Sequence, residues 1–241
     1  MKCYWNKISA LLSKDMRDNL KNPQLMVMVL LPVVFVSIYR FMDFGGEHLG
    51  RDYLMLLGVV MTGVMVPISF LSTSIAEEKE KNTLRTLMLS NVTGGQFLLS
   101  KGLMALLLTL VVDTAVFFIC NAPVKMLPAY LLCAAIGSLG LIFLGAVVGL
   151  LSKDQMSTGI VSAPLMILLL MPTVFSSMNS FFAAAAKFVP TTVLVDLLLL
   201  STDGIALTEP VMLKNLLAAL AWGVGLGVVC LVVYRRDRLD R

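Results

Sequence analysis

The chain has 241 residues, of which 58% are hydrophobic and 14% are charged, and its formal net charge at pH 7 is +4. Soluble globular domains have about 25% charged residues, so this composition excludes a soluble domain and indicates an integral membrane protein. The predicted fold class is an all-α polytopic membrane protein, in which residues 1–241 form a single transmembrane domain.

Residues 1–23 are predicted to form an interfacial helix. Apolar side chains recur there at helical spacing, and Lys and Asp residues fall between them. The apolar positions are Tyr4, Trp5, Ile8, Leu11, Leu12 and Met16. A basic amphipathic helix of this kind lies along the cytoplasmic surface of a membrane, and Asn22-Pro23 ends it. It serves either as a lipid anchor or as an elbow that also contacts a partner.

Six apolar segments are long enough to cross a hydrocarbon core of about 30 Å as helices. They cover residues 25–42, 53–76, 102–122, 128–151, 158–177 and 215–234. The uncharged stretch from residue 155 to 186 is too long for one crossing at about 1.5 Å per residue, so we end the fifth span near residue 177. The segment 181–200 contains Pro190 and Asp196, which predicts a re-entrant helical hairpin on the outer side.

Lys and Arg residues are unevenly divided between the two sides that these spans define. Fourteen lie on the side of the two termini and five on the opposite side. The positive-inside rule therefore places both termini in the cytoplasm.

The four cysteines show no CxxC spacing and lie mostly within predicted spans. This placement favours buried free thiols. A disulfide between Cys120 and Cys133 near the outer face is the alternative.

The loop after the second span begins with a charged block, residues 77–81, followed by a short amphipathic helix over 82–91 with Asn82 as a candidate N-cap. Leu84, Leu87 and Met88 share one face of it. A helix of about two turns is not stable alone, so it requires a docking surface, such as a groove on a soluble protein. Thr93 and Gln96 then have the spacing of a capping box that starts the third span.

The sequence Glu77-Glu78-Lys79-Glu80-Lys81-Asn82-Thr83-Leu84-Arg85-Thr86-Leu87 resembles the loop Glu-Glu-Lys-Glu-(Lys/Arg)-x-Thr-Leu-x-x-Leu of permease subunits of ATP-binding cassette (ABC) exporters. The resemblance is to the six-span, ABC-2 type branch. The order of interfacial helix, spans, loop and outer hairpin agrees along nearly the whole chain. One departure is Ser90-Asn91, where many members have Ser or Thr followed by Pro.

The resemblance implies that the 82–91 segment is a coupling helix, through which ATP binding and hydrolysis by separate cytoplasmic ATPase subunits change the access of the permease. The implied ATPase-coupling residues are Glu77, Glu78, Glu80, Thr83, Leu84, Leu87 and Met88. The chain itself has no G-x-x-x-x-G-K-[ST] loop, so we expect no catalytic residue, cofactor or metal in it, and ATP and Mg bind to the partner ATPase.

The expected partners are therefore that ATPase, a second permease copy or homologous permease, and membrane lipid, without nucleic acid. The expected location is the cell membrane. The direction of transport, export, follows from the resemblance to the family branch alone. The sequence leaves open both the substrate and the choice between a homodimer and a heterodimer of permeases.

In the resembled family the second and fifth spans line the route. Candidate pathway residues are Thr62, Met65, Ser69, Thr109, Asp113, Met166 and Thr173. Asp113 is the only acidic residue deep within a clear span, and it binds a cation, relays a proton or pairs across helices. Ordinary helix packing is the alternative for each of these residues. Gly145 to Gly149 and Gly223 to Gly227 have the small-xxx-small spacing of close helix contact.

Two other function classes are an intramembrane enzyme and a stand-alone channel or secondary transporter. An intramembrane enzyme needs a reactive cluster, but the single histidine, His48, falls in a predicted outer loop, and there is no HExxH motif. A stand-alone channel or secondary transporter remains the alternative, because Asp113 and broken helices occur there too. The amphipathic segment at 82–91 favours the ABC permease, since a channel has no need of it.

Overall fold

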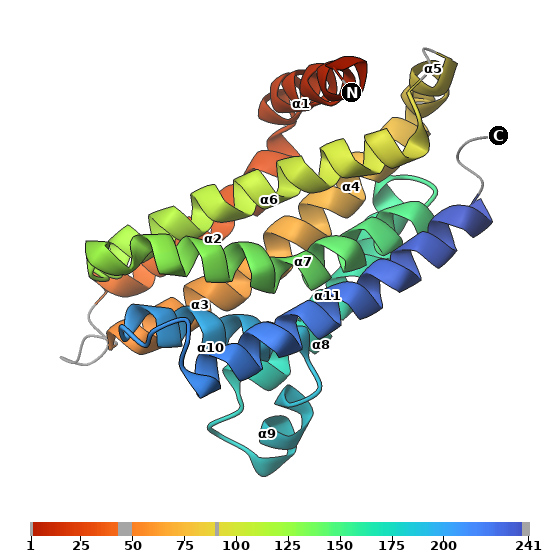
Figure 1. Ribbon diagram of the computed structural model, residues 1–241. Coiled ribbons are helices and arrows are strands. Elements are labelled where there is room, and N and C mark those ends of the chain that lie inside the picture. The colour runs from red at the N-terminus through yellow and green to blue at the C-terminus, as the bar shows by residue number, and fades with distance from the viewer. Residues whose placement is uncertain (1, 43–49, 90–91, 238–241) are drawn as a thin grey trace.

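The computed structural model of the protein describes residues 2–42, 50–89 and 92–237, and all regular structure within these ranges is helical (Figure 1). In chain order the elements are α1 (Lys2–Lys21), α2 (Pro23–Phe41), α3 (Arg51–Val64), the π-helical η1 (Met65–Phe70), α4 (Leu71–Glu80), α5 (Thr83–Leu89), α6 (Gly94–Ile119), the 3₁₀ turn η2 (Val124–Met126), α7 (Leu127–Leu151), α8 (Gln155–Val174), α9 (Ser180–Ala186), α10 (Pro190–Thr202) and α11 (Pro210–Asp237). The predicted all-α polytopic class is confirmed.

Five helices of the described ranges are long and apolar enough to cross a membrane. They are Arg51–Glu80, Gly94–Ile119, Val124–Leu151, Gln155–Val174 and Pro210–Arg236. The predicted first span corresponds to α2, a shorter apolar helix. The predicted capping box of Thr93 and Gln96 is confirmed and starts α6 at Gly94, so this helix begins ahead of the apolar segment 102–122. The fifth span is α8, which ends at Val174 rather than near residue 177.

The second span is one continuous helix made of α3, η1 and α4. It is 30 residues long, about 45 Å at 1.5 Å per residue, so it exceeds the hydrocarbon thickness and carries its last turn beyond it. The π-helical segment contains Pro67, which has no N–H to give to the helix ladder. In the most apolar stretch of this helix 78% is buried within the chain, compared with 22% for α8 and 17% for α11. This helix is therefore the centre of the bundle.

Gly145 and Gly149 let α7 pack directly against the second span. A Cβ atom at Gly145 would lie 2.3 Å from the Pro67 carbonyl oxygen, and one at Gly149 would lie 3.0 Å from the Ser72 Cα. Such distances leave no room for a side chain, so the two backbones touch. The close contact predicted from the glycine spacing is confirmed here.

The predicted outer hairpin corresponds to α9 and α10, which are bent by 87° to one another. Pro190 stands at the start of α10, where its missing N–H costs nothing. α10 packs against α3, α7 and α11. Asp203, just after α10, forms a 3.0 Å ion pair with Arg51 at the start of α3. Asp196 is exposed.

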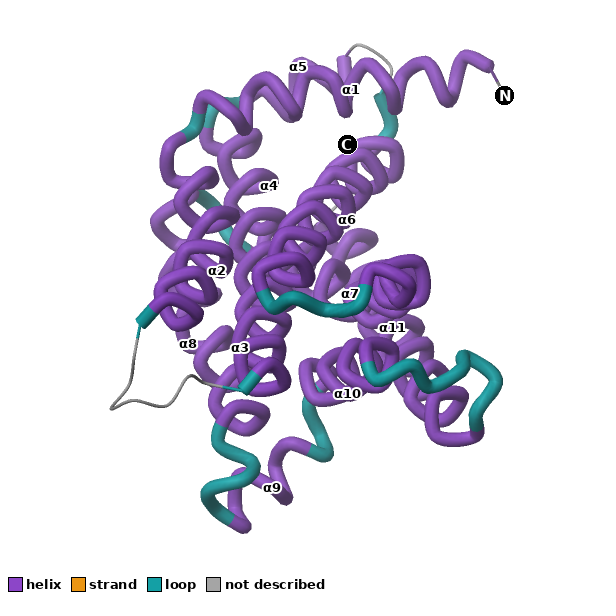
Figure 2. Tube along the Cα trace, turned by 90° about the vertical axis from the view of Figure 1, so that its left-hand side faces the viewer, coloured by secondary structure: helices purple, strands orange, loops and turns teal. Residues whose placement is uncertain are grey.

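Figure 2 shows α1 lying across one end of the bundle, the same end that carries α5 and the last turns of α11 (Figure 1). We call it the α5 end; α9 lies toward the opposite end. Cys120, Cys133 and Cys230 are buried free thiols, so the alternative of a Cys120–Cys133 disulfide is not realised.

Candidate functional site: the last turn of α4 and the start of α5

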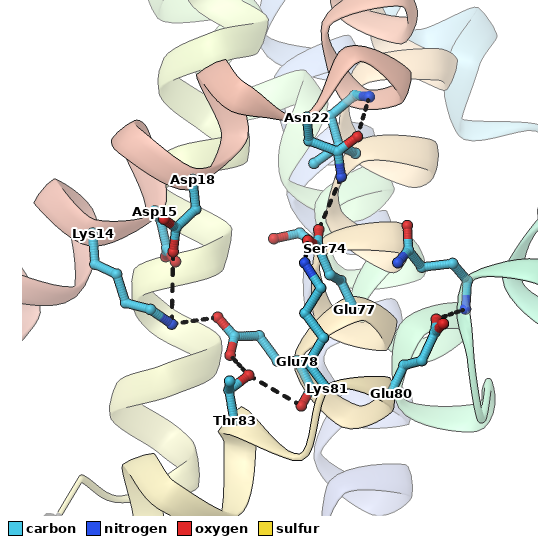
Figure 3. Close-up of polar contacts among 12 residues, drawn as sticks. Lys14, Asp15, Asp18, Asn22, Ser74, Glu77, Glu78, Glu80, Lys81 and Thr83 are labelled. Carbon is cyan, nitrogen blue, oxygen red and sulfur yellow. Dashed lines mark hydrogen bonds and ion pairs between the residues drawn. The ribbon is translucent and has the colours of Figure 1, made fainter.

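The candidate site is built on the last turn of α4, where four consecutive residues, Glu77 to Glu80, contact four different parts of the protein. Figure 3 shows Glu78 between Lys14 and Thr83, while Glu80 points elsewhere, toward the start of α8. These contacts come about because the second span continues as one rigid helix past the membrane, so successive side chains point about 100° apart around its end.

Glu78 joins three elements. Its carboxylate accepts a 2.6 Å hydrogen bond from Lys14 of α1 and lies 3.5 Å from the Lys101 ammonium of α6. It also accepts a close hydrogen bond from the Thr83 hydroxyl at the start of α5. The side chain is 9% exposed, so these contacts replace the water that a carboxylate otherwise requires.

Lys101 and Asp15 form the most buried ion pair of the site. Their charged atoms are 2.8 Å apart. Ser74 of α4 lies 2.9 Å from the Lys101 ammonium, and the Ser100 hydroxyl donates to Asp15 at 3.4 Å. Sequence reasoning assigned Asp15 to the polar side of the first helix and gave Lys101 no role. The available signal was that Asp15 continues the apolar stripe of Ile8 and Leu11 at helical spacing.

Glu77 faces the joint between α1 and α2. It accepts a 3.0 Å hydrogen bond from the Asn22 side chain and a 2.5 Å hydrogen bond from Lys81. The hydrogen bond and charge of Glu77 raise the pKa of Lys81 above its ordinary value. Glu77 therefore pairs with a neighbour in its own segment, whereas the basic partners of Glu78 lie on α1 and α6.

Lys79 and Glu80 contact the two helix ends that flank the short turn between α7 and α8, the end of α7 and the start of α8. The Lys79 ammonium donates to the carbonyls of Leu150 and, at 3.3 Å, of Ser152, at the carboxyl end of α7. Glu80 accepts a 3.1 Å hydrogen bond from the backbone N–H of Gln155, the first residue of α8. Neither contact was predicted, because the partners lie about 70 residues further along the chain.

The short helix α5 covers Thr83–Leu89, inside the predicted range of 82–91; residues 90 and 91 lie outside the described residues. Asn82, expected as an N-cap, has a left-handed backbone with φ of 56°, which separates α4 from α5. Leu84 is buried and Leu87 half-buried in a cluster with α1 and α6, whereas Leu89 is 79% exposed. The Met88 side chain lies outside the described part of the chain.

Most candidate pathway residues lie inside this chain. Thr62, Ser69, Thr109, Asp113 and Thr173 are buried, and Met65 and Met166 are half-buried. The structure brings Thr62 and Asp113 into contact. The Thr62 and Thr109 hydroxyls each donate at 2.8 Å to a carbonyl of their own helix, that of Gly58 and that of Ala105.

Tyr130 was missed by sequence reasoning. It is fully buried near Asp113. Within the described residues, its hydroxyl and the Asp113 Oδ1 lack a hydrogen-bond partner. The sequence carries no signal for this pairing, since a tyrosine near the end of an apolar span is common at membrane interfaces.

The described ranges contain no group of three His, Cys, Asp or Glu side chains placed to hold a metal ion. A family model described as "ABC-2 family transporter protein" matches residues 9–234. No curated protein matches the sequence of this chain.

Proposed function

This chain belongs to the ABC-2 family of transporter proteins, and we propose that it is the permease subunit of an ATP-driven exporter, forming the translocation pathway with a second permease. Membership makes it a multi-pass transport subunit of an ABC transporter, associated with a cytoplasmic ABC ATPase and not itself the ATPase. Export, the second permease and the coupling residues are the proposed parts.

The observation that carries the proposal is the contact pattern of Glu77 to Glu80. A solvated helix end would leave these side chains free, and a push on α5 would then only bend the loop. Instead Thr83, the first residue of α5, bonds to Glu78, and Glu78 bonds to α1 and α6. A displacement of α5 therefore moves the end of the central span.

The buried face of α5 refines the expected partner contact. Leu84 and Leu87 pack into the protein's own cluster of apolar side chains, which supplies the docking surface that such a short helix needs. The side that carries exposed Leu89 is then left for the ATPase. The coupling segment is thus held by the permease on one side and pushed by the ATPase on the other.

The arrangement of the ends supports the proposed topology. α1, α5 and the last turns of α11 lie at one end of the bundle (Figure 1), which agrees with both termini in the cytoplasm and a location in the cell membrane. With the shorter α2 counted as a span beside the five long helices, the chain has six spans, half of a twelve-span transporter, which supports a second permease, either a copy or a homologous chain. ATP and Mg²⁺ would bind to the ATPase.

A stand-alone channel or secondary transporter is the second candidate. The observation that favours it is the buried contact of Asp113 and Thr62, because charged groups within spans mark ion pathways in such proteins. In the exporter, the same contact pairs the second and third spans.

Co-purification tests the proposal. We expect an ABC ATPase, identified by mass spectrometry, to co-purify with the wild-type chain and to be lost on Leu89→Asp. Met178→Asp is the matched control, because Met178 is 76% exposed near the opposite end. Solute movement by the purified chain in vesicles without ATPase or nucleotide would contradict the proposal and favour the second candidate.

A further inference from the structure

The fifth span, α8, is lightly held by apolar packing. Only 22% of the most apolar stretch of this helix is buried within the chain. Its polar contacts with other elements lie at its two ends, Gln155 at the α5 end and Thr173 at the other. A helix with few buried contacts is drawn from the less stable part of a structure, so α8 moves more readily than the second span and α7.

At the α5 end, the contacts of Lys79 and Glu80 follow the electrostatics of helix ends. Exposed carbonyls give the carboxyl end of a helix a partial negative charge, and free N–H groups give its amino end a partial positive one. Lys79 places its ammonium on carbonyls at the end of α7, and Glu80 places its carboxylate on the first N–H of α8. Each charge has the sign that its helix end favours.

The turn between α7 and α8 is only residues 152–154, so the two contacts fix it as a unit. Asp154 closes the turn from inside by accepting a 2.7 Å hydrogen bond from the Ser157 backbone N–H. α7 is already packed backbone to backbone against the second span at Gly145 and Gly149. α7 therefore moves with α4 in any case, whereas α8 packs against the second span and has the Glu80 contact as its hydrogen bond to the end of that helix.

At its other end, α8 is joined to the outer hairpin. The Thr173 hydroxyl lies 2.8 Å from the Thr191 hydroxyl of α10, which also donates to the Leu169 carbonyl at 2.9 Å. Both threonines are buried. A change in the tilt of α8 therefore displaces the start of α10 as well.

We propose that Lys79 and Glu80 are positioning residues that pass a displacement of α5 to α8, so that the fifth span is the element whose tilt changes access, and that the Thr173–Thr191 contact passes this change to the outer hairpin. The inference rests on the proposed function, because the displacement comes from the ATPase. It adds a second route beside the Glu78 network.

Two pairs of spin labels in the assembled complex test this inference. The pair Met156–Val232 reports the start of α8, and the pair Thr86–Val232 reports α5. Met156 and Val232 are 81% and 61% exposed, and Thr86 is also exposed. The native cysteines are replaced by alanine, and labelled copies are diluted with unlabelled ones so that distances within one chain are measured. A non-hydrolysable ATP analogue is then added.

In the otherwise wild-type complex, we expect the analogue to shift both distances. With Lys79→Met and Glu80→Met combined, the shift at Met156–Val232 is lost, the shift at Thr86–Val232 remains, and the ATPase still co-purifies. Lys79→Arg retains both shifts because it keeps the charge and the donors. Lys81→Met is the matched control, since Lys81 is one residue away and pairs only locally with Glu77 in the contacts described above.

The outcomes separate the two proposals. If both shifts persist in the double variant, the inference about Lys79 and Glu80 is wrong while the proposed function stands. If neither distance responds to nucleotide in the otherwise wild-type complex with ATPase bound, the proposed function fails and the inference with it. A charge swap, Lys79→Glu with Glu80→Lys, keeps the composition and is expected to lose the Met156–Val232 shift as well.

Discussion

Asp15 of α1 and Lys101 of α6 form a 2.8 Å ion pair whose side chains are 3% and 4% exposed. The pair fastens the helix that crosses the α5 end of the bundle to the third span, and through Ser74 to the second. The first helix is therefore held to the bundle by a buried ion pair, and its contact with a partner stays a prediction.

Removing one partner of this pair is expected to destabilise the protein by about 3–5 kcal/mol, because the other charge is left buried and unpaired. Lys101→Met should therefore lower the midpoint of thermal unfolding in detergent strongly, and Asp15→Leu combined with Lys101→Met should recover much of the loss. Lys81→Met, which breaks an exposed pair, should cost about 0.5 kcal/mol or less. Equal midpoints for Lys101→Met and the wild type would disprove the burial of this pair.

Gly149→Ala is expected to destabilise the contact between α7 and α4 by about 1–3 kcal/mol, because the added methyl meets backbone atoms of Ser72 that have no room to shift alone. Gly159→Ala is the matched control. A Cβ atom there has open space around it, and alanine favours helix more than glycine. The measurement is again thermal unfolding in detergent. A Gly149→Ala protein as stable as the Gly159→Ala protein would show that the two helices pack less closely than described.

The start of α8 is expected to depend on pH through Asp154. Hydrogen bonds from Ser157 lower the pKa of this carboxyl below its ordinary value of 3.8. A lowered pKa in the folded state means that the stabilisation is complete above 3.8 and is lost as the pH falls through the folded pKa. A spin label at Met156 should become more mobile over that acidic range. Asp154→Asn keeps the cap and should abolish the pH response; an unchanged response would assign it to another group.

Tyr130→Phe is expected to leave stability unchanged or to raise it by up to about 1 kcal/mol, since it removes a buried hydroxyl that lacks a partner within the described residues. The ring stays packed on Phe117, whose centroid is 5.0 Å away. Thermal unfolding checks this. If Tyr130→Phe is clearly less stable, the hydroxyl has a partner. If it is stable but stops transport, the hydroxyl acts together with Asp113 in the transport cycle.

Local patterns of the sequence were sufficient to predict the main helices of the fold. Apolar length predicted the spans, and the Thr93–Gln96 spacing predicted the start of α6, because a capping box depends on residues only three apart. The start of the fifth span was placed three residues late, since Asp154 and Ser157 form a capping box that the spacing of Asp and Ser signals only weakly.

The candidate site was predicted only in part. The sequence located it at residues 77–91, but its partners lie on α1, α6, α7 and α8, and contacts between residues 23 to 75 positions apart leave no periodic trace. Leu84 illustrates the limit. Its amphipathic spacing shows that one face is covered, but not whether the protein itself or a partner covers it, and here the protein does.

The central claim is that α5 transmits the action of an ABC ATPase to the end of the second span. Its most direct test is cysteine cross-linking from Leu89→Cys, with Met178→Cys as the control at the opposite end. We predict that position 89 forms a covalent adduct with the ATPase subunit and that position 178 does not. A complex that hydrolyses ATP yet yields no adduct at position 89, or yields it equally at position 178, would contradict the account.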